Sequence, residues 1–287
     1  MGEKIDSKAI GLDTGVALIT WLTGAENLHY GLWDGLEVAA GNLRQAQDAY
    51  TAKLFSHLPR MPLRILDIGG GAGITAAKLI ALGHQVDIVV PSSYLAGRCR
   101  ENAPQATVHE CLFEDFKGTG PYDLCLFSES FQYIPLKESL PRCLSLLRPG
   151  GKILIADCFR TEAYKGRKAE GPQPGGGHQV AAFRAALAQS PLIVRHEEDI
   201  TDSVAPSIDL EQGFFNVLGL GLSRTQDEIR RKKPKLYWAL AKLISAILSK
   251  RRRENLVQRL TANTRTSHAF RHYNRYLIVV LEKPEAA

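Results

Sequence analysis

The chain has 287 residues, of which 45% are hydrophobic and 23% charged. This composition excludes general disorder and can bury the core of one large domain or two small ones. The longest apolar stretch, residues 236–248 with Lys242 inside it, is shorter than the roughly 20 residues that a membrane-spanning helix needs. The first ten residues lack the apolar centre of a secretory signal. We therefore expect a cytoplasmic protein.

The five cysteines are odd in number, and no pair is spaced as Cys-x-x-Cys. This pattern argues against both a disulfide framework and a zinc site, and it predicts reduced thiols. No metal is expected, because no group of Cys and His residues has the spacing of a ligand set.

The net charge of +6 is concentrated in one segment of the chain. Residues 224–259 contain 12 Lys or Arg residues against 3 acidic residues, whereas the remainder has 24 basic against 27 acidic residues. A uniformly basic surface would indicate nonspecific affinity for nucleic acid. Here any partner attracted by the charge is expected at residues 224–259.

In chain order, strand patterns alternate with helix patterns. Residues 35–57 have apolar side chains at a helical spacing that ends at Pro59. The apolar run 63–68 then leads through a glycine-rich turn into the helix-like stretch 74–83. Further strand candidates are residues 86–90, 124–127 and 152–156, and the helix-compatible stretches between them are residues 93–102 and 136–147. This alternation predicts an α/β fold with a doubly wound parallel sheet.

The glycine-rich turn at residues 69–73 is the first candidate for a ligand site. In a doubly wound sheet the ligand binds at the carboxyl ends of the strands. Glycine there can adopt positive φ and lets backbone N–H groups approach a ligand at a helix N-terminus. Asp67 stands two residues before the first glycine. A carboxylate at that place would repel a pyrophosphate, but it would attract a cation that carries an ammonium and a sulfonium group.

Residues 65–73, with the sequence ILDIGGGAG, resemble the first motif of the class I S-adenosylmethionine-dependent methyltransferases. The resemblance continues in order through the acidic turn at 113–116, the fourth-strand segment 121–134 and the fifth-strand entry at 146–157. The aromatic segment 28–34 is similar to that of the small-molecule branch, which includes enzymes of ubiquinone, tocopherol and natural-product pathways. The resemblance implies S-adenosylmethionine as cofactor and a Rossmann-like, mostly parallel seven-stranded sheet.

The resemblance also implies a set of cofactor-binding residues. These are Asp67, Gly69, Gly71, Gly73, Ser92, Glu114, Asp115, Ser128 and Tyr30. A structural alternative stays open for Asp67: backbone amides could donate hydrogen bonds to its carboxylate, without any ligand. Another stays open for Glu114 and Asp115, which could form a solvated turn. The family usually has an acid at the end of the second strand to hold the ribose hydroxyls, but this sequence has Val90 there, and Asp87 is out of register. We expect Ser92 or the backbone to hold the ribose instead.

Methyl transfer from a sulfonium is an in-line displacement whose electrophile is already activated. Alignment of the two reactants can supply about 7–11 kcal/mol in favourable cases, and a base is needed only where the acceptor must lose a proton. The catalytic candidates are Glu129, His29 and Tyr133, and His178 is a further candidate base in a distant loop. For His29 and Tyr30, a structural role in packing a helix end is an equal alternative to a functional role.

Four regions are expected along the chain: an N-terminal helical lid (1–58), the cofactor-binding core (59–160), a loop and helical cap on the acceptor side (161–270), and the last strand with its tail (271–287). Within the last two regions we expect a mobile loop at 163–177, a helix at 179–189, a sixth strand at 192–201, helices at 208–222 and 225–262, and a final strand at 276–282. As the resemblance implies, the last two strands flank one edge of the sheet, with one of them antiparallel.

The basic segment contains a helix with one apolar face, formed by residues 236, 240, 243, 244 and 247. It could pack on the core as a cap. Alternatively, residues 230–253 could cover a lipophilic substrate, rest on anionic lipid or dock an acidic carrier protein. Nucleic acid is not expected, because no binding module is present.

The favoured function is methyl transfer from S-adenosylmethionine to a small lipophilic or aromatic metabolite, with an oxygen, nitrogen or carbon acceptor. If residues 230–253 rest on anionic lipid, we expect the protein at the periphery of the membrane. Two other functions stay open: a nicotinamide-dependent oxidoreductase, and a noncatalytic protein with the same fold. The oligomeric state is not indicated.

Overall fold

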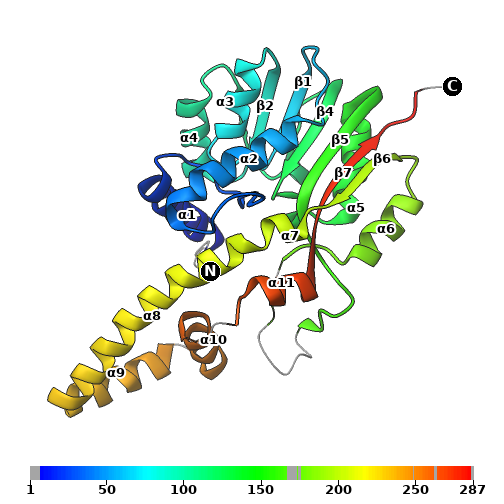
Figure 1. Cartoon of the computed structure of the whole chain (residues 1–287). Helices are drawn as coiled ribbons and strands as arrows, with labels where there is room; N and C mark the ends of the chain where they lie inside the picture. Colours follow the sequence, from blue (N-terminus) through cyan, green and yellow to red (C-terminus); the bar gives the residue numbers. More distant parts are fainter. Residues whose placement is uncertain (1–6, 167–172, 174–175, 248, 262–263, 286–287) are drawn as a thin grey trace.

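Seven strands form one sheet in the computed structural model, which describes residues 7–166, 173, 176–247, 249–261 and 264–285 (Figure 1). The strand order is β3-β2-β1-β4-β5-β7-β6, and β7 runs antiparallel to the other six strands. The strands are β1 (Arg64–Ile68), β2 (Gln85–Val90), β3 (Thr107–Glu110), β4 (Tyr122–Ser128), β5 (Leu147–Arg160), β6 (Ile193–Asp199) and β7 (Asn274–Glu282). The predicted fold is confirmed, including the two final strands at one edge.

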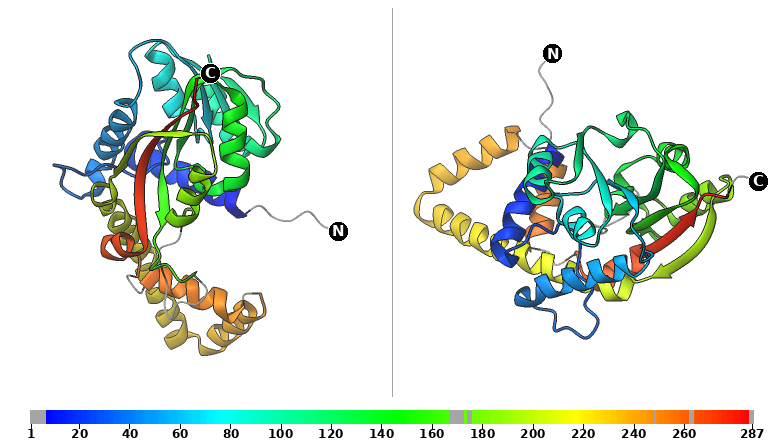
Figure 2. Two further views of the ribbon diagram at one scale, coloured as in Figure 1. Left: turned by 90° about the vertical axis from the view of Figure 1, so that its right-hand side faces the viewer. Right: turned by 90° about the horizontal axis from the view of Figure 1, so that it is seen from above.

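Helices cover both faces of the sheet (Figures 1 and 2). The helices are α1 (Ser7–Thr23), α2 (Leu43–Phe55), α3 (Ile74–Ala81), α4 (Ser93–Asn102), α5 (Leu136–Leu146), α6 (Val180–Ala188), α7 (Thr201–Val204), α8 (Pro206–Lys232), α9 (Pro234–Ile247), α10 (Lys250–Thr261) and α11 (Ser267–Tyr273). Apolar residues of α2, α3 and α4 pack on one face, and those of α5 and α6 pack on the other. Successive strand residues alternate between these faces, so Ile65 joins the first core and Leu66 the second.

Several boundaries differ from the prediction. The helix expected at 35–57 begins only at Leu43, because residues 24–39 form an irregular segment whose Leu32 N–H donates to the Ala46 carbonyl at 2.9 Å. The helix expected at 225–262 is divided, since Pro234 has no N–H to continue α8 and instead begins α9. The short strand β3 was not predicted. Residues 167–172 and 174–175 of the predicted loop lie outside the described residues.

Helices α8, α9 and α10 form an arm, residues 206–261, that extends from the sheet domain (Figures 1 and 2). Helix α10 packs back on α8: Gln212 Nε2 donates to the Arg259 carbonyl at 3.0 Å, and Arg259 lies 4.2 Å over the Phe215 ring. Gly219 of α8 permits this approach, because a Cβ there would collide with the Leu260 carbonyl. None of the described side chains of α9 is buried. Among the helices that the structure describes, none combines the length and hydropathy needed to cross a bilayer.

Candidate functional site

The glycine turn lies between the end of β1 and the start of α3. Gly69, Gly71 and Gly73 have φ values of 76°, 55° and 86°, a region that favours glycine. Space requires glycine as well, since a Cβ on Gly69 would collide with the Ser130 side chain and one on Gly73 would lie 2.9 Å from Cys99 Cα. The turn therefore holds the backbone in a shape that other residues could not adopt without strain.

Asp67 lies buried against this turn, with 1% of its surface exposed. Its Oδ2 atom has no hydrogen-bond partner, and a Cβ on Gly70 would lie only 2.7 Å from that oxygen. Burial raises the pKa of the Asp67 carboxyl to about 7. A buried carboxylate oxygen without a partner is costly unless a cation or donor satisfies it. The backbone amides of the turn do not serve Oδ2, so this atom is available to a bound ligand.

The end of β2 has no acid, as the sequence indicated. Val90 is the last residue of β2 and is buried. Asp87 is held in mid-strand by the Tyr122 hydroxyl and by Arg64 Nη2 at 3.3 Å. Beyond the strand, Ser92 Oγ accepts a hydrogen bond from Leu95 N–H at 3.3 Å and donates to Asp13 Oδ1 at 3.4 Å.

Asp13 belongs to α1, so the N-terminal helix brings a carboxylate to the end of β2 that the second strand itself lacks. The sequence analysis did not find Asp13. No local pattern could have found it, because the contact depends on how α1 packs against the start of α4.

The segment after α1 passes over the glycine turn. A Cβ on Gly71 would be 3.8 Å from the Leu28 side chain, and one on Gly15 would be at the same distance. Glu26 fixes this segment to α4 through an ion pair with Arg98 and through the Asn102 amide at 2.7 Å. The segment around Leu28 thus lies against the strand-end edge that carries the glycine turn.

Glu129 follows β4 and has φ of 58°, a conformation that is strained for a residue with a side chain. Its Oε1 atom accepts hydrogen bonds from Tyr30 N–H at 2.7 Å and from the Tyr276 hydroxyl at 2.9 Å. Burial raises the pKa of the Glu129 carboxyl to about 8. The predicted residues Glu129 and Tyr30 are therefore in direct contact, and β7 contributes Tyr276, which the sequence analysis missed because only the strand order brings β7 beside β5.

A tyrosine network extends from Glu129 toward α2. The hydroxyls of Tyr276 and Tyr50 lie 2.8 Å apart, and Tyr50 Oη lies 3.3 Å from Ser128 Oγ. His29 stacks on Tyr50 with ring centroids 4.4 Å apart. The Nδ1 atom of His29 lies 2.8 Å from the Tyr30 carbonyl oxygen, and its Nε2 atom lies 3.4 Å from Thr51 Oγ1. Burial lowers the pKa of His29 to about 4, so the ring is neutral at pH 7.

Next to Glu129, the 3₁₀ helix Phe131–Tyr133 carries Tyr133, whose surface is 63% exposed. Buried Asp157 accepts a hydrogen bond from Gln132 N–H at 3.0 Å, and burial raises the pKa of Asp157 to about 7. His178 Nε2 lies 3.1 and 2.9 Å from the carbonyls of Phe131 and Ile134, so this ring supports the turn. Clusters of buried acids with raised pKa values are typical of functional sites.

The other predicted residues lie apart from this group. Glu114 and Asp115 form part of the 3₁₀ helix Phe113–Asp115, where Asp115 is exposed and Glu114 is partly buried. Ser128 ends β4 and joins the tyrosine network. The structure thus brings Glu129, Tyr30, His29 and Ser128 together, while Asp67 and the glycines form a neighbouring part of the same strand-end edge.

Residues 65–151, which contain the glycine turn and Glu129, match the sequence model of a methyltransferase domain. The chain contains a class I S-adenosylmethionine-dependent methyltransferase domain. S-adenosylmethionine is the cofactor that such a domain implies.

Two curated relatives support this assignment. The chain is 33% identical over 127 residues to the tRNA 5-carboxymethoxyuridine methyltransferase of Escherichia coli (strain K12), a match that covers 40% of this chain and 48% of that relative. It is 30% identical over 107 residues to the ubiquinone biosynthesis O-methyltransferase of Xanthomonas oryzae pv. oryzae (strain PXO99A), covering 35% of this chain and 45% of that relative. The matches therefore span about half the length of these curated relatives.

The fold is similar over a longer range to a solved structure, the geranyl diphosphate C-methyltransferase from Streptomyces coelicolor A3(2). The TM-score is 0.64 with 14% sequence identity, and the match covers 98% of this chain and 100% of that one. At this identity the likeness shows the shared fold, including the elements outside the methyltransferase domain.

The residues of the methyltransferase domain fit the cofactor. The unpartnered Oδ2 of Asp67 is suited to an ammonium group, and at Gly71 a Cβ would meet only the Leu28 side chain, at 3.8 Å. The strand-end edge is therefore the candidate ligand site of the domain.

Proposed function

We propose that the protein transfers a methyl group from S-adenosylmethionine to a small lipophilic acceptor that reaches it from an anionic membrane surface. When bound, the cofactor supplies a sulfonium-activated methyl carbon: the acceptor's lone pair forms the new bond to carbon, and the carbon–sulfur bond breaks to leave S-adenosylhomocysteine. The observation that carries the transfer is the buried, unpartnered Asp67 carboxylate against the glycine turn.

Each part of the site has a physical role in this proposal. Asp67 binds the cofactor's ammonium, and the lid segment around Leu28 excludes water from the glycine turn. The pKa of Glu129 is about 8, so most of this carboxyl is protonated at pH 7 and can donate a hydrogen bond to an acceptor oxygen or nitrogen. Its ionised fraction can take a proton that the acceptor loses. His29 and Tyr133 remain predicted catalytic residues.

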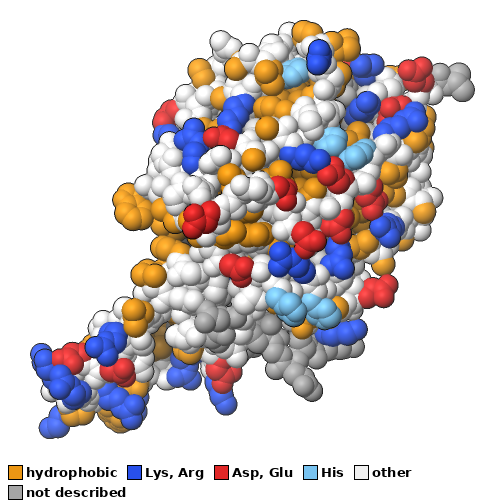
Figure 3. Space-filling view, in the orientation of Figure 1, with side chains coloured by type: hydrophobic (Ala, Val, Ile, Leu, Met, Phe, Trp, Pro, Cys, Tyr) orange, Lys and Arg blue, Asp and Glu red, His pale blue; other side chains and the backbone are white. Residues whose placement is uncertain are grey.

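The surface of the arm is the observation that favours a lipophilic acceptor. Its helix α9 exposes six large apolar side chains, each 38–68% exposed: Leu236, Trp238, Leu240, Leu243, Ile244 and Ile247. Basic residues flank this apolar face at 230–235 and 250–253, and Figure 3 shows Lys and Arg side chains gathered beside hydrophobic ones at the far end of the arm. A helix with these properties lies at the interface of a bilayer and is attracted by anionic lipid.

The cofactor part is tested by calorimetric titration with S-adenosylhomocysteine, S-adenosylmethionine and NADH. Binding of the first two without the third supports the proposal, and binding of NADH alone would favour an oxidoreductase. Transfer of labelled methyl from S-adenosylmethionine into a lipid extract then tests the acceptor. RNA is tested as an acceptor in the same way. Cofactor binding without methyl transfer to the lipid extract or to RNA would favour the noncatalytic alternative.

The membrane part is tested by sedimentation with vesicles of phosphatidylcholine alone or mixed with phosphatidylglycerol. We expect binding to the anionic vesicles and its loss in the double variant Leu243→Glu with Ile247→Glu. Leu82→Glu is the matched control, because Leu82 is 60% exposed and lies outside the arm. Equal binding to both vesicle types, retention in the double variant, or binding of an acidic protein without vesicle binding would refute this part.

A further inference from the structure

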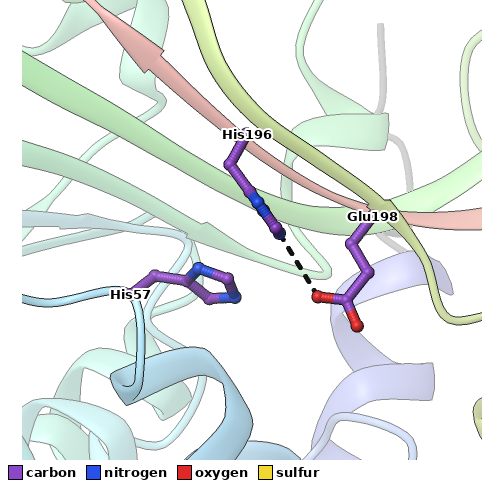
Figure 4. A group of neighbouring side chains, drawn as sticks. All are labelled: His57, His196 and Glu198. Carbon is purple, nitrogen blue, oxygen red and sulfur yellow. Dashed lines mark hydrogen bonds and ion pairs between the residues drawn. The ribbon is translucent and has the colours of Figure 1, made fainter.

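Three side chains of metal-binding type meet at the β6 edge of the sheet (Figure 4). His57 follows α2, whereas His196 and Glu198 stand two residues apart on β6 and so project from the same face of the strand. Their ligand-type atoms all lie within 4.8 Å of one another. Since β6 is four strands from β1 in the sheet order, this cluster is separate from the glycine turn.

His57 is the member of the cluster with an unsatisfied atom. Its Nε2 is buried and has no hydrogen-bond partner, although a buried ring nitrogen normally has one. Burial lowers the pKa of His57, and the neighbouring His196 and Lys53 lower it further. The unpartnered Nε2 is therefore open to a ligand, and the centroid of the His196 ring is 4.7 Å away.

Glu198 supplies the negative charge. Its Oε1 forms an ion pair with Lys53 Nζ at 2.7 Å, and its Oε2 lies 3.3 Å from His196 Nε2. The hydrogen bond from Lys53 is the largest cause of a lowered pKa of Glu198, so the carboxylate is ionised at neutral pH. A metal ion could bind Oε2 while Lys53 stays on Oε1, and His196 would offer the Nε2 lone pair with its ring proton on Nδ1.

We propose that His57, His196 and Glu198 bind one Zn²⁺ ion, with water as the fourth ligand. Two imidazoles and a carboxylate form a donor set that zinc accepts in tetrahedral geometry, with bonds of about 2.0–2.2 Å. Such bonds put ligand atoms roughly 3.3 Å apart. Since the ligand atoms all lie within 4.8 Å of one another, no pair must approach by more than about 1.5 Å. Rotation of the Glu198 side chain, which is 33% exposed, and of the His196 ring can supply this movement.

The experiment is calorimetric titration of the metal-stripped full chain, without a polyhistidine tag, with zinc sulfate at pH 7.5. We expect one zinc ion per chain, and an affinity at least tenfold lower in His57→Ala and in Glu198→Gln. His268→Ala is the matched control, because His268 is exposed and lies outside the cluster. Cobalt binding should give the visible absorption of a tetrahedral site in the wild type and in the control only.

Thermal unfolding in chelator first verifies that the variants fold. Zinc should then raise the unfolding temperature of the wild type and of His268→Ala, but not that of His57→Ala. Absence of stoichiometric zinc binding, or equal affinity in His57→Ala and His268→Ala, would overturn the proposal, and the second result would assign the zinc to other groups such as the free thiols. No cofactor is present in these measurements, so their outcome is independent of the proposed methyl transfer.

Discussion

Binding of S-adenosylhomocysteine should release a proton from Asp67. The carboxyl has a pKa of about 7 in the free protein because it is buried without a partner. An ammonium group placed against it favours the ionised form. If the cofactor binds only that form, the number of protons released equals the protonated fraction: about 0.9 at pH 6, about 0.5 at pH 7 and about 0.2 at pH 7.5. The observed affinity should rise about eightfold between pH 6 and pH 7.5.

Calorimetry in buffers of different ionisation enthalpy measures both quantities. In Asp67→Asn the pH-dependent release should disappear, and the affinity at pH 7.5 should fall about 30-fold or more, which corresponds to about 2 kcal/mol for removing one partner of a buried charge pair. Asp87→Asn is the control variant, since Asp87 is engaged by Arg64 and Tyr122 in mid-strand and should change the affinity less than about twofold.

Methylthioadenosine is the control ligand, because it lacks the amino acid part of the cofactor. It should bind without the Asp67-dependent proton release. If the wild type and Asp67→Asn released the same number of protons at every pH, or if methylthioadenosine gave the same release as S-adenosylhomocysteine, Asp67 would not be the ammonium partner.

Three further predictions concern the partners that the tertiary structure supplies. Asp13→Asn should weaken S-adenosylhomocysteine binding about threefold to tenfold in calorimetry, because Asp13 and Ser92 are the polar groups at the end of β2; unchanged affinity would place the ribose elsewhere. Tyr276→Phe removes a hydroxyl shared by Glu129 and Tyr50 and should cost about 1–2 kcal/mol in urea unfolding, whereas a neutral effect would mean that water replaces it. The raised pKa of Glu129 keeps its carboxyl protonated in the fold, so its contribution to stability is full below pH 4 and is lost as the pH rises toward 8. Unfolding temperatures measured from pH 5 to pH 8 should therefore fall with pH, and less steeply in Glu129→Gln than in the wild type.

The central strands and the glycine turn were predictable because their signals are local. An apolar run such as residues 63–68 followed by glycines predicts a buried strand and a turn whatever surrounds them. Strand β3 lacks such a signal, because its four residues do not form an apolar run and none of them is buried. The start of α2 was misplaced because Gly35 has a φ of 73°, outside the helical region, and residues 40–42 form a 3₁₀ helix before α2.

The side chains that complete the site were not predictable from local pattern. Asp13 and Tyr276 reach the strand-end edge only after α1 has packed on α4 and β7 has entered the sheet between β5 and β6. The cluster of His57, His196 and Glu198 is a similar case, since His57 and the β6 residues are far apart in the sequence. Spacing rules for metal ligands detect neighbours along the chain, so the expectation of no metal rested on a pattern that could not include this cluster.

The proposed zinc site and the Glu129 network share two elements of the fold. Helix α2 carries Tyr50 and leads directly into His57, while His196 of β6 pairs with Val280 of β7, the strand that carries Tyr276. A metal ion bound at the β6 edge would therefore restrain both the element that carries Tyr276, the hydroxyl partner of Glu129, and the element that carries Tyr50, the partner of Tyr276. Asp67 belongs to neither element, so His57→Ala should lower the zinc affinity at least tenfold and leave the proton release on S-adenosylhomocysteine binding unchanged. A change in that release would show that the two sites are coupled through the sheet and are not independent.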